Sequence, residues 1–116
     1  MRTVIGLDWH PEAARERLAL PARERVALQN AVAKLKADPL LGHPHTSEVR
    51  GARSLRELRP RAGRSVTRAL YRRIGDVLVI GAVGPEAEVD RRGYDRAVRL
   101  AEQRLDQYEP ERRHQL

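Results

Sequence analysis

The sequence predicts a single α+β domain: an N-terminal strand and a helical hairpin, an antiparallel three-strand basic meander, and a C-terminal helix. Three observations lead to this prediction. The 116 residues are 41% hydrophobic and 34% charged, a composition typical of one folded domain. Apolar residues recur with helical spacing in two separate stretches. Between these stretches, short apolar runs are divided by glycine turns, as in a sheet.

The N-terminal part predicts a strand followed by two helices. Arg2 to Trp9 alternates loosely between apolar and polar residues, which is typical of a strand. His10-Pro11 places proline at the first position of a helix. Pro21 ends this helix and begins a second one, which is apolar at i, i+4 and i+7 from Leu28. Asp38-Pro39 stops the second helix.

The remaining elements complete the order β-α-α-β-β-β-α. Residues 40–51 are expected to be irregular because Gly and Pro interrupt them. Strands are expected at 55–61, 65–74 and 77–83, joined by turns at Arg61-Ala62-Gly63 and Gly75-Asp76. A helix from about Asp90 to Tyr108 has one apolar stripe. We expect one domain over residues 1–110 and a disordered charged tail at 111–116.

Several classes of protein are excluded by composition. The absence of cysteine excludes a disulfide scaffold, a thiolate metal site and thiol chemistry. No apolar run approaches the ~20 residues of a membrane helix, and a charge precedes any signal-peptide core. His43 and His45 lack a carboxylate cluster, so loop positions are favoured over a metal site. We expect a cytoplasmic protein with no metal, no small-molecule cofactor and no membrane partner.

The positive charge is concentrated in one segment. The chain carries a formal charge of +7, and the segment Arg50–Arg73 alone has nine arginines and one acid, Glu57, a net +8. Such a block is typical of a surface that binds a polyanion, and the planar fork of arginine suits phosphate oxygens. We expect these arginines to line the face of the sheet that the helical hairpin leaves free.

The order of motifs in this segment carries a family resemblance. A Glu-Leu-Arg strand at 55–59, the turn Gly63-Arg64 and an Arg-x-x-Tyr strand at Arg68–Arg72 precede the apolar strand Val77–Val83. In this order and spacing they resemble the RelE/ParE superfamily of bacterial type II toxins, closest to its HigB-like, phage-derived branch. The resemblance covers Val49 to about Arg104, and the N-terminal strand and hairpin fit the family's layout.

The resemblance implies a ribosome-dependent mRNA endonuclease, an mRNA interferase, that inhibits translation. In this family the ribose 2′-OH attacks the adjacent phosphate, and a cognate antitoxin, often a small helix-turn-helix protein, silences the toxin. Arg68 lies where the family has a phosphate-stabilising arginine, and Arg64 is a second catalytic candidate. The candidate RNA-binding residues are Arg56, Arg59, Arg61, Arg64, Arg72 and Arg73.

After the last strand the chain departs from the family pattern. RNA-cleaving members usually have a further Arg or a Lys pair there, whereas this chain has Glu86, Glu88 and Asp90. Three interpretations stay open. Glu86 or Glu88 could act as a general base with a pKa raised toward neutrality, or the nuclease has degenerated. The third, which we favour, is that the acids face solvent and begin the last helix.

The other candidates have structural alternatives. Tyr94 opens the last helix near the expected groove, so it is a catalytic candidate, with core packing as the alternative. Tyr71 and Tyr108 lie on apolar stripes and are expected in the core. His10 is expected at the entry of a helix. His114 falls in the predicted tail, although the family does place a catalytic His or Tyr near the C-terminus.

Two other functions fit the sequence. One is a ParE-like toxin that inhibits DNA gyrase without nuclease activity, which the missing cation after the last strand makes more plausible. The other is a catalytically degenerate relic whose basic sheet binds RNA or an antitoxin, because an acidic partner could neutralise the sheet as readily as RNA.

Overall fold

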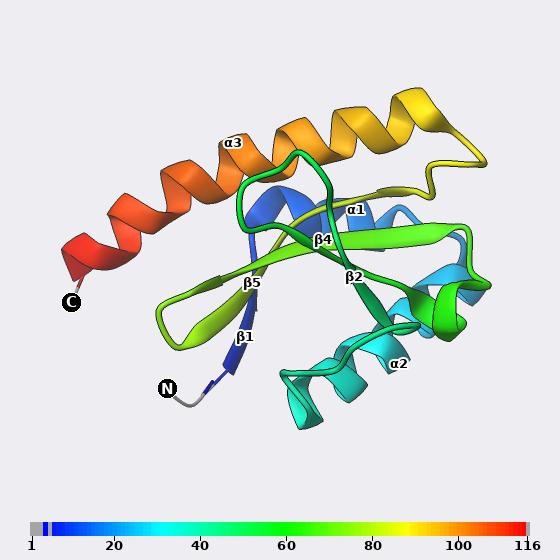
Figure 1. Ribbon diagram of the computed structural model, residues 1–116, viewed down its shortest axis with the longest axis horizontal. Coiled ribbons are helices and arrows are strands. Elements are labelled where there is room, and N and C mark those ends of the chain that lie inside the picture. The colour runs from blue at the N-terminus through cyan, green and yellow to red at the C-terminus, as the bar shows by residue number, and fades with distance from the viewer. Residues whose placement is uncertain (1–3, 5, 116) are drawn as a thin grey trace.

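Five strands form one mixed sheet with helices on both of its faces (Figure 1). The computed structural model describes residue 4 and residues 6–115, with side chains up to residue 108. The strand order is β1-β5-β4-β3-β2. β1 pairs in parallel with β5, and the other pairs are antiparallel. The strands are β1 (Gly6–Trp9), β2 (Thr46–Glu48), β3 (Arg56–Leu58), β4 (Thr67–Ile74) and β5 (Val77–Pro85).

The helices follow the predicted order. α1 (Pro11–Leu18) and α2 (Ala22–Ala37) form the hairpin, and α3 (Arg91–Gln115) is the last helix. The backbone N–H of Glu12 donates to Nδ1 of His10 at 3.1 Å, which confirms His10 as the entry residue of α1. The predicted tail at 111–116, including His114, has its side chains outside the described residues, so its disorder stays a prediction.

The α+β prediction is confirmed, with two local corrections. The segment predicted as irregular contains β2, which pairs with β3; a strand of three residues is too short to show alternation. The strand predicted at 55–61 ends at Leu58, because Pro60 has no N–H to donate to a ladder. A 3-10 turn, η1 (Pro60–Gly63), follows, in which Arg61 and Ala62 have φ of 56° and 55°.

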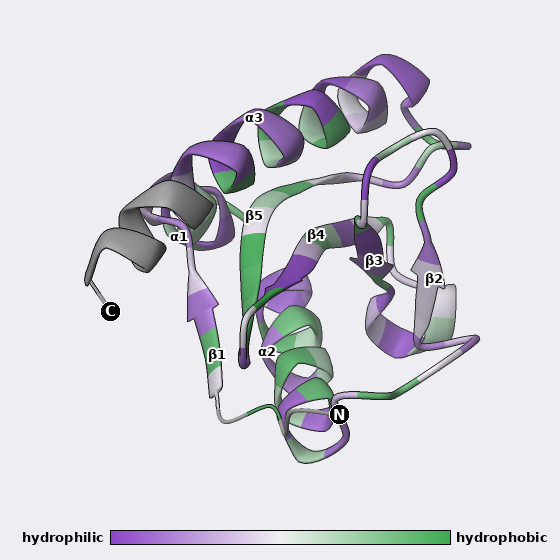
Figure 2. Ribbon diagram, turned by 60° about the vertical axis from the view of Figure 1, so that its left-hand side comes forward, coloured by the Kyte–Doolittle hydropathy of each residue, from purple (hydrophilic) through white to green (hydrophobic). Residues whose placement is uncertain are grey.

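The sheet face predicted to be free is covered by α3. Leu105, Ala101 and Ala97 of α3 are at most 4% exposed and pack on Leu70 and Val79 of the sheet. The hairpin covers the opposite face, where Leu28 and Leu35 pack with Tyr71 and Ile80. Figure 2 shows that β5 is largely apolar and that α3 is mostly hydrophilic along its length, with short apolar stretches. Tyr71, which is 2% exposed, is confirmed as a core residue.

Close packing of α3 brings the start of β4, the end of β5 and the first turns of α3 together at one end of the strands. Arg68 near the start of β4 pairs with Gly84 near the end of β5. A side chain at Gly84 would put Cβ 2.6 Å from Cβ of Ala97, so glycine lets α3 approach this end of β5. The first turns of α3 therefore lie beside Arg68. No helix among the described residues is long and apolar enough to cross a membrane.

Candidate functional site

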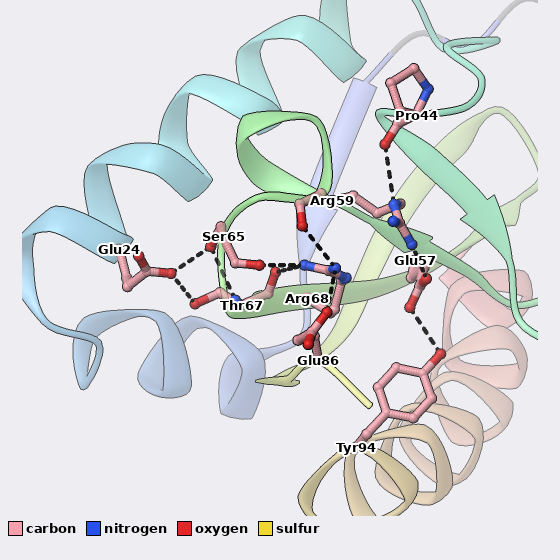
Figure 3. A network of polar contacts seen from close by, with 10 residues as sticks. Glu24, Pro44, Glu57, Arg59, Ser65, Thr67, Arg68, Glu86 and Tyr94 are labelled. Atoms are coloured by element: carbon pink, nitrogen blue, oxygen red, sulfur yellow. Dashed lines mark hydrogen bonds and ion pairs between the residues drawn. The ribbon is translucent and has the colours of Figure 1, made fainter. Parts of the chain in front are cut away.

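Arg68 has its guanidinium fixed against the preceding turn (Figure 3). Nη1 donates to the carbonyl oxygens of Ser65 at 2.7 Å and Thr67 at 2.9 Å. Nη2 donates to the carbonyl of Gly63 at 3.3 Å and to the carboxylate of Glu86 at 3.0 Å. The Arg68 side chain is 3% exposed. Its two terminal nitrogens thus make four hydrogen bonds, three of them to backbone.

Burial of the guanidinium is the main cause that lowers the pKa of Arg68 below its ordinary value, and the positive charge of Arg59 is the second cause. An arginine guanidinium nevertheless stays protonated in proteins. The result is a permanent cation that is poorly solvated and held in one orientation, which is the arrangement that stabilises a developing negative charge most effectively.

A carboxylate from the helical hairpin holds this turn in place. Glu24 of α2 accepts hydrogen bonds from Oγ of Ser65 at 2.5 Å and from Oγ1 of Thr67 at 2.7 Å. These two bonds, that of Ser65 first, lower the pKa of Glu24. Because Ser65 and Thr67 also supply carbonyls to Arg68, α2 fixes the position of the guanidinium through the turn.

A second chain of contacts runs from α3 to β3. The hydroxyl of Tyr94 donates to Glu57 at 2.9 Å, and Glu57 accepts from Nη1 of Arg59 at 3.0 Å. Nε of Arg59 donates to the carbonyl of Pro44 at 3.1 Å. Burial, and next the bond to Glu57, raise the pKa of Tyr94 well above its ordinary value. Tyr94 therefore keeps its proton at neutral pH and is a hydrogen-bond donor.

An open groove of about 530 Å³ beside α3, which we call the groove, is lined by Arg68, Glu57, Arg59 and Tyr94 among others. It contains three of the four predicted catalytic residues, Arg68, Tyr94 and Glu86. Arg91, at the start of α3, supplies a cation after the last strand, which sequence reasoning did not find. The formal charges of the groove cancel, because its lining has as many arginines as glutamates. They are Arg50, Arg59, Arg68, Arg91, Glu48, Glu57, Glu86 and Glu88.

The acids after β5 have three different environments. Glu86 pairs with Arg68, and its backbone N–H donates to the carbonyl of Val66 at 2.8 Å, so the interpretation of a merely solvated acid is wrong for Glu86. Glu88 is exposed. Asp90 accepts from the backbone N–H of Gly93 at 2.9 Å, which caps the first turn of α3 as an acid at a helix start is expected to do.

Arg64 and Arg61 line a different cavity, of about 230 Å³ between α2 and η1, which we call the α2 pocket. Nε of Arg64 donates to the carbonyl of Arg61 at 3.0 Å. Because η1 turns the chain after Arg59, Arg61 does not reach the groove. Of the lining residues only Arg59 lines both cavities. The other polar residues of the pocket are Asn30, Lys34 and His45.

The remaining predicted RNA-binding arginines lie outside both cavities. Arg56 donates to Oγ1 of Thr46 at 2.8 Å. Arg72, 3% exposed, pairs with Asp106 of α3 at 2.7 Å, and this bond is the main reason that the pKa of Asp106 is lowered. Arg73 donates to the carbonyl of Gly75 at 2.9 Å. All three border a third cavity of about 610 Å³. Arg72 thus joins α3 to the sheet.

Some residues that line the two cavities were not identified as site residues from the sequence, among them Glu57, Lys34 and His45. Glu57 had a local signal, because it is the only acid in the basic segment and shares a strand face with Arg59. Lys34 and His45 had none, since the tertiary fold alone brings them to η1. Within the described part of the chain, no three His, Cys, Asp or Glu side chains are grouped so that they could hold a metal ion.

No protein-family model and no curated protein matches the chain. Solved structures do. An arginine double mutant of the Escherichia coli toxin RelE in the free state superimposes with a TM-score of 0.60 at 22% identity, over 84% of this chain and 97% of RelE. The intact E. coli RelBE toxin-antitoxin complex gives a TM-score of 0.56 at 22% identity, over 69% of this chain and 94% of the matched chain.

The archaeal RelE-RelB complex from Pyrococcus horikoshii gives a TM-score of 0.52 at 17% identity, over 72% of this chain and 96% of the matched chain. The HigB-like branch that the motifs indicated is not among these neighbours and stays a prediction. Because the superposition covers most of both chains in bacterial and archaeal structures, the chain has the fold of the RelE toxins.

Proposed function

We propose that this protein is the toxin of a type II toxin–antitoxin pair and that it inhibits translation by cleaving mRNA on the ribosome. The observation that carries the proposal is the guanidinium of Arg68, which is buried and held by three backbone carbonyls at the floor of an open groove. The fold of the RelE toxins supports the same assignment.

In the proposed reaction the ribose 2′ hydroxyl loses its proton to water as its oxygen attacks the adjacent phosphorus, which forms a 2′,3′-cyclic phosphate. The bond from phosphorus to the 5′ oxygen of the next nucleotide breaks, and this oxygen takes up a proton from water. Negative charge grows on the phosphate oxygens, and Arg68 is already oriented to stabilise it. Tyr94 keeps its proton and donates a hydrogen bond to Glu57, so its role in this scheme is to hold Glu57 and its partner Arg59 in place rather than to act as a base.

Binding of the phosphate requires an exchange of anions at Arg68. Three of its partners are backbone carbonyls, whereas the fourth, Glu86, is a side chain that is 20% exposed on the loop after β5. Glu86 is therefore the partner that a phosphate oxygen can replace. The exchange leaves Arg68 paired with one anion before and after binding, which limits the desolvation cost.

The proposed protein partner is a cognate antitoxin. RelE proteins of the same fold occur in complexes with antitoxins, as in the E. coli RelBE toxin-antitoxin complex and the archaeal RelE-RelB complex. Action on ribosomes would place the protein in the cytoplasm.

The test is induced expression in bacteria, followed by protein-synthesis labelling and mapping of transcript ends. Wild-type protein should stop translation and generate new 5′ ends, and Arg68→Ala should do neither. Arg99→Ala, which removes an exposed arginine of α3 outside the groove, is the matched control. Thermal unfolding of each purified variant checks that it folds. Arg68→Lys is a further variant, because it retains the positive charge but lacks the planar fork of the guanidinium.

Three results would contradict the proposal: unaffected growth, inhibited growth with intact transcripts, or cutting that persists in folded Arg68→Ala. Intact transcripts with a DNA-damage response would instead favour the gyrase-inhibiting alternative.

A further inference from the structure

We propose that the α2 pocket is a second RNA-contact site, which holds one nucleotide of the bound strand at a distance from Arg68. That the ligand is RNA rests on the proposed function. The site itself rests on the charge and shape of the pocket, and it gives roles to Asn30, Lys34 and His45.

The α2 pocket carries positive charge. Lys34 of α2 and Arg61 and Arg64 at η1 converge on the pocket, and no carboxylate is among the described residues that line it. Two acids outside the lining have other partners. Glu24 accepts from Ser65 and Thr67, and Arg61 contributes only a smaller part to its lowered pKa. Glu57 pairs with Arg59 on the side of the groove. A concave surface lined by uncompensated cations attracts a phosphate group.

The lining of the α2 pocket also fits the chemical parts of a nucleotide. The floor of the pocket is apolar, formed by Ala27, Ala31, Leu41 and Leu58. The amide of Asn30 and the imidazole of His45 can both donate and accept hydrogen bonds. An apolar floor suits the face of a base, the two polar groups suit its edge, and the cationic rim suits its phosphate. This combination fits a nucleotide better than a simple anion.

The size and the position of the α2 pocket fit one nucleotide of a longer strand. A pocket of about 230 Å³ is smaller than the ~300–1,000 Å³ typical of drug-sized ligands, so it suits one unit of a chain. Arg59 lines both this pocket and the groove, and η1 provides Arg61 to the pocket and the Gly63 carbonyl to Arg68. A strand that places one phosphate at Arg68 can therefore continue along Arg59 to the pocket.

The lysine content of the chain provides a direct test, because Lys34 and Lys36 are its only lysines. Both are exposed on α2, and only Lys34 lines the pocket. The purified full chain is acylated with an amine-specific reagent, with and without a saturating 2′-O-methyl oligonucleotide, which lacks the attacking hydroxyl. Labelling is read by peptide mass spectrometry.

We expect the oligonucleotide to lower labelling of Lys34 at least fivefold while Lys36 changes less than twofold. The inference would be overturned if the oligonucleotide left the labelling of Lys34 unchanged. It would also be overturned if the oligonucleotide protected Lys34 and Lys36 equally. Protection of Lys34 by polyglutamate but not by the oligonucleotide would also overturn it, in favour of an acidic protein partner. None of these readouts depends on cleavage, so a chain that protects Lys34 but cuts no transcript contradicts the proposed function alone.

A matched pair of variants gives a second measurement. Each phosphate contact with a single strand contributes about 0.7 to the slope of log K against log salt. Lys34→Ala should therefore lower the slope by about 0.7, and Lys36→Ala should leave it unchanged. Equal slopes for the two variants would contradict the assignment.

Discussion

The groove beside α3 and the α2 pocket share Arg59 but differ in how their charge is used. In the groove four arginines face four glutamates, and Arg68 and Arg59 each pair with one of them. In the α2 pocket Lys34, Arg61 and Arg64 face no carboxylate of the described lining.

This difference shows that the net charge of a segment does not by itself locate a polyanion site, because it does not tell which cations are already paired. Paired arginines are oriented and poorly solvated, which favours stabilisation of one developing charge. Unpaired arginines and lysines on a rim release counterions and provide affinity. We therefore expect loss of Arg68 in the groove to change chemistry more than binding, and loss of a cation of the pocket to change binding.

The largest effect is expected for Arg68→Ala. Loss of one preorganised donor to a developing oxyanion costs about 10²–10³ in rate, so cleavage of ribosome-bound mRNA should fall by that factor. Affinity for a 2′-O-methyl oligonucleotide should change less than threefold, because the pocket remains. A loss of affinity as large as the loss of rate would break the division between the two cavities.

The next effect concerns the anion already bound to Arg68. Glu86→Gln removes the competing charge and should tighten oligonucleotide binding about tenfold, which corresponds to ~1.4 kcal/mol. Glu88→Gln is the matched control, because Glu88 lies in the same loop and lines the same groove but is exposed. Fluorescence anisotropy measures both. Equal gains for the two variants would show a general charge effect and contradict the proposed exchange at Arg68.

The smallest effect is expected for Glu24→Gln, which weakens the support of the turn between the two cavities. A neutral acceptor makes weaker hydrogen bonds, so the free energy of unfolding at pH 7 should fall by about 1 kcal/mol.

The sign of its pH dependence follows from the lowered pKa of Glu24. Its contribution is present above the ordinary value of 4.5 and is lost as pH falls through the lower folded value. The gap between wild type and variant in denaturant melts should therefore close below pH 4.5. A gap that widens in acid would contradict the assignment.

The order of elements was accessible from the sequence because its signals are local. Proline at Pro11 and Pro21, and the spacing from Leu28, define the hairpin within a few residues. The apolar stripe of α3 showed that the helix buries one side, but not which face of the sheet it covers. β2 was missed because three residues do not show a period, and its pairing with β3 is a tertiary contact.

The site was only partly accessible for similar reasons. Arg68 and Arg72 share a strand face, but four residues separate them by about 13 Å along β4, and Arg72 reaches Asp106 instead. Arg64 was assigned to the groove because sequence spacing does not reveal the positive φ of Arg61 and Ala62, which accompanies the turn toward α2.

The central claim is that the groove uses its charges internally while the α2 pocket offers its charges to RNA. Its most direct test is the salt dependence of oligonucleotide binding for variants of two exposed arginines, Arg64→Ala in the pocket and Arg91→Ala in the groove. Nε of Arg91 pairs with Asp95 at 3.3 Å. We predict that Arg64→Ala lowers the slope of log K against log salt by about 0.7 and that Arg91→Ala lowers it by less than half as much. Equal reductions, or a larger one for Arg91→Ala, would contradict the central claim.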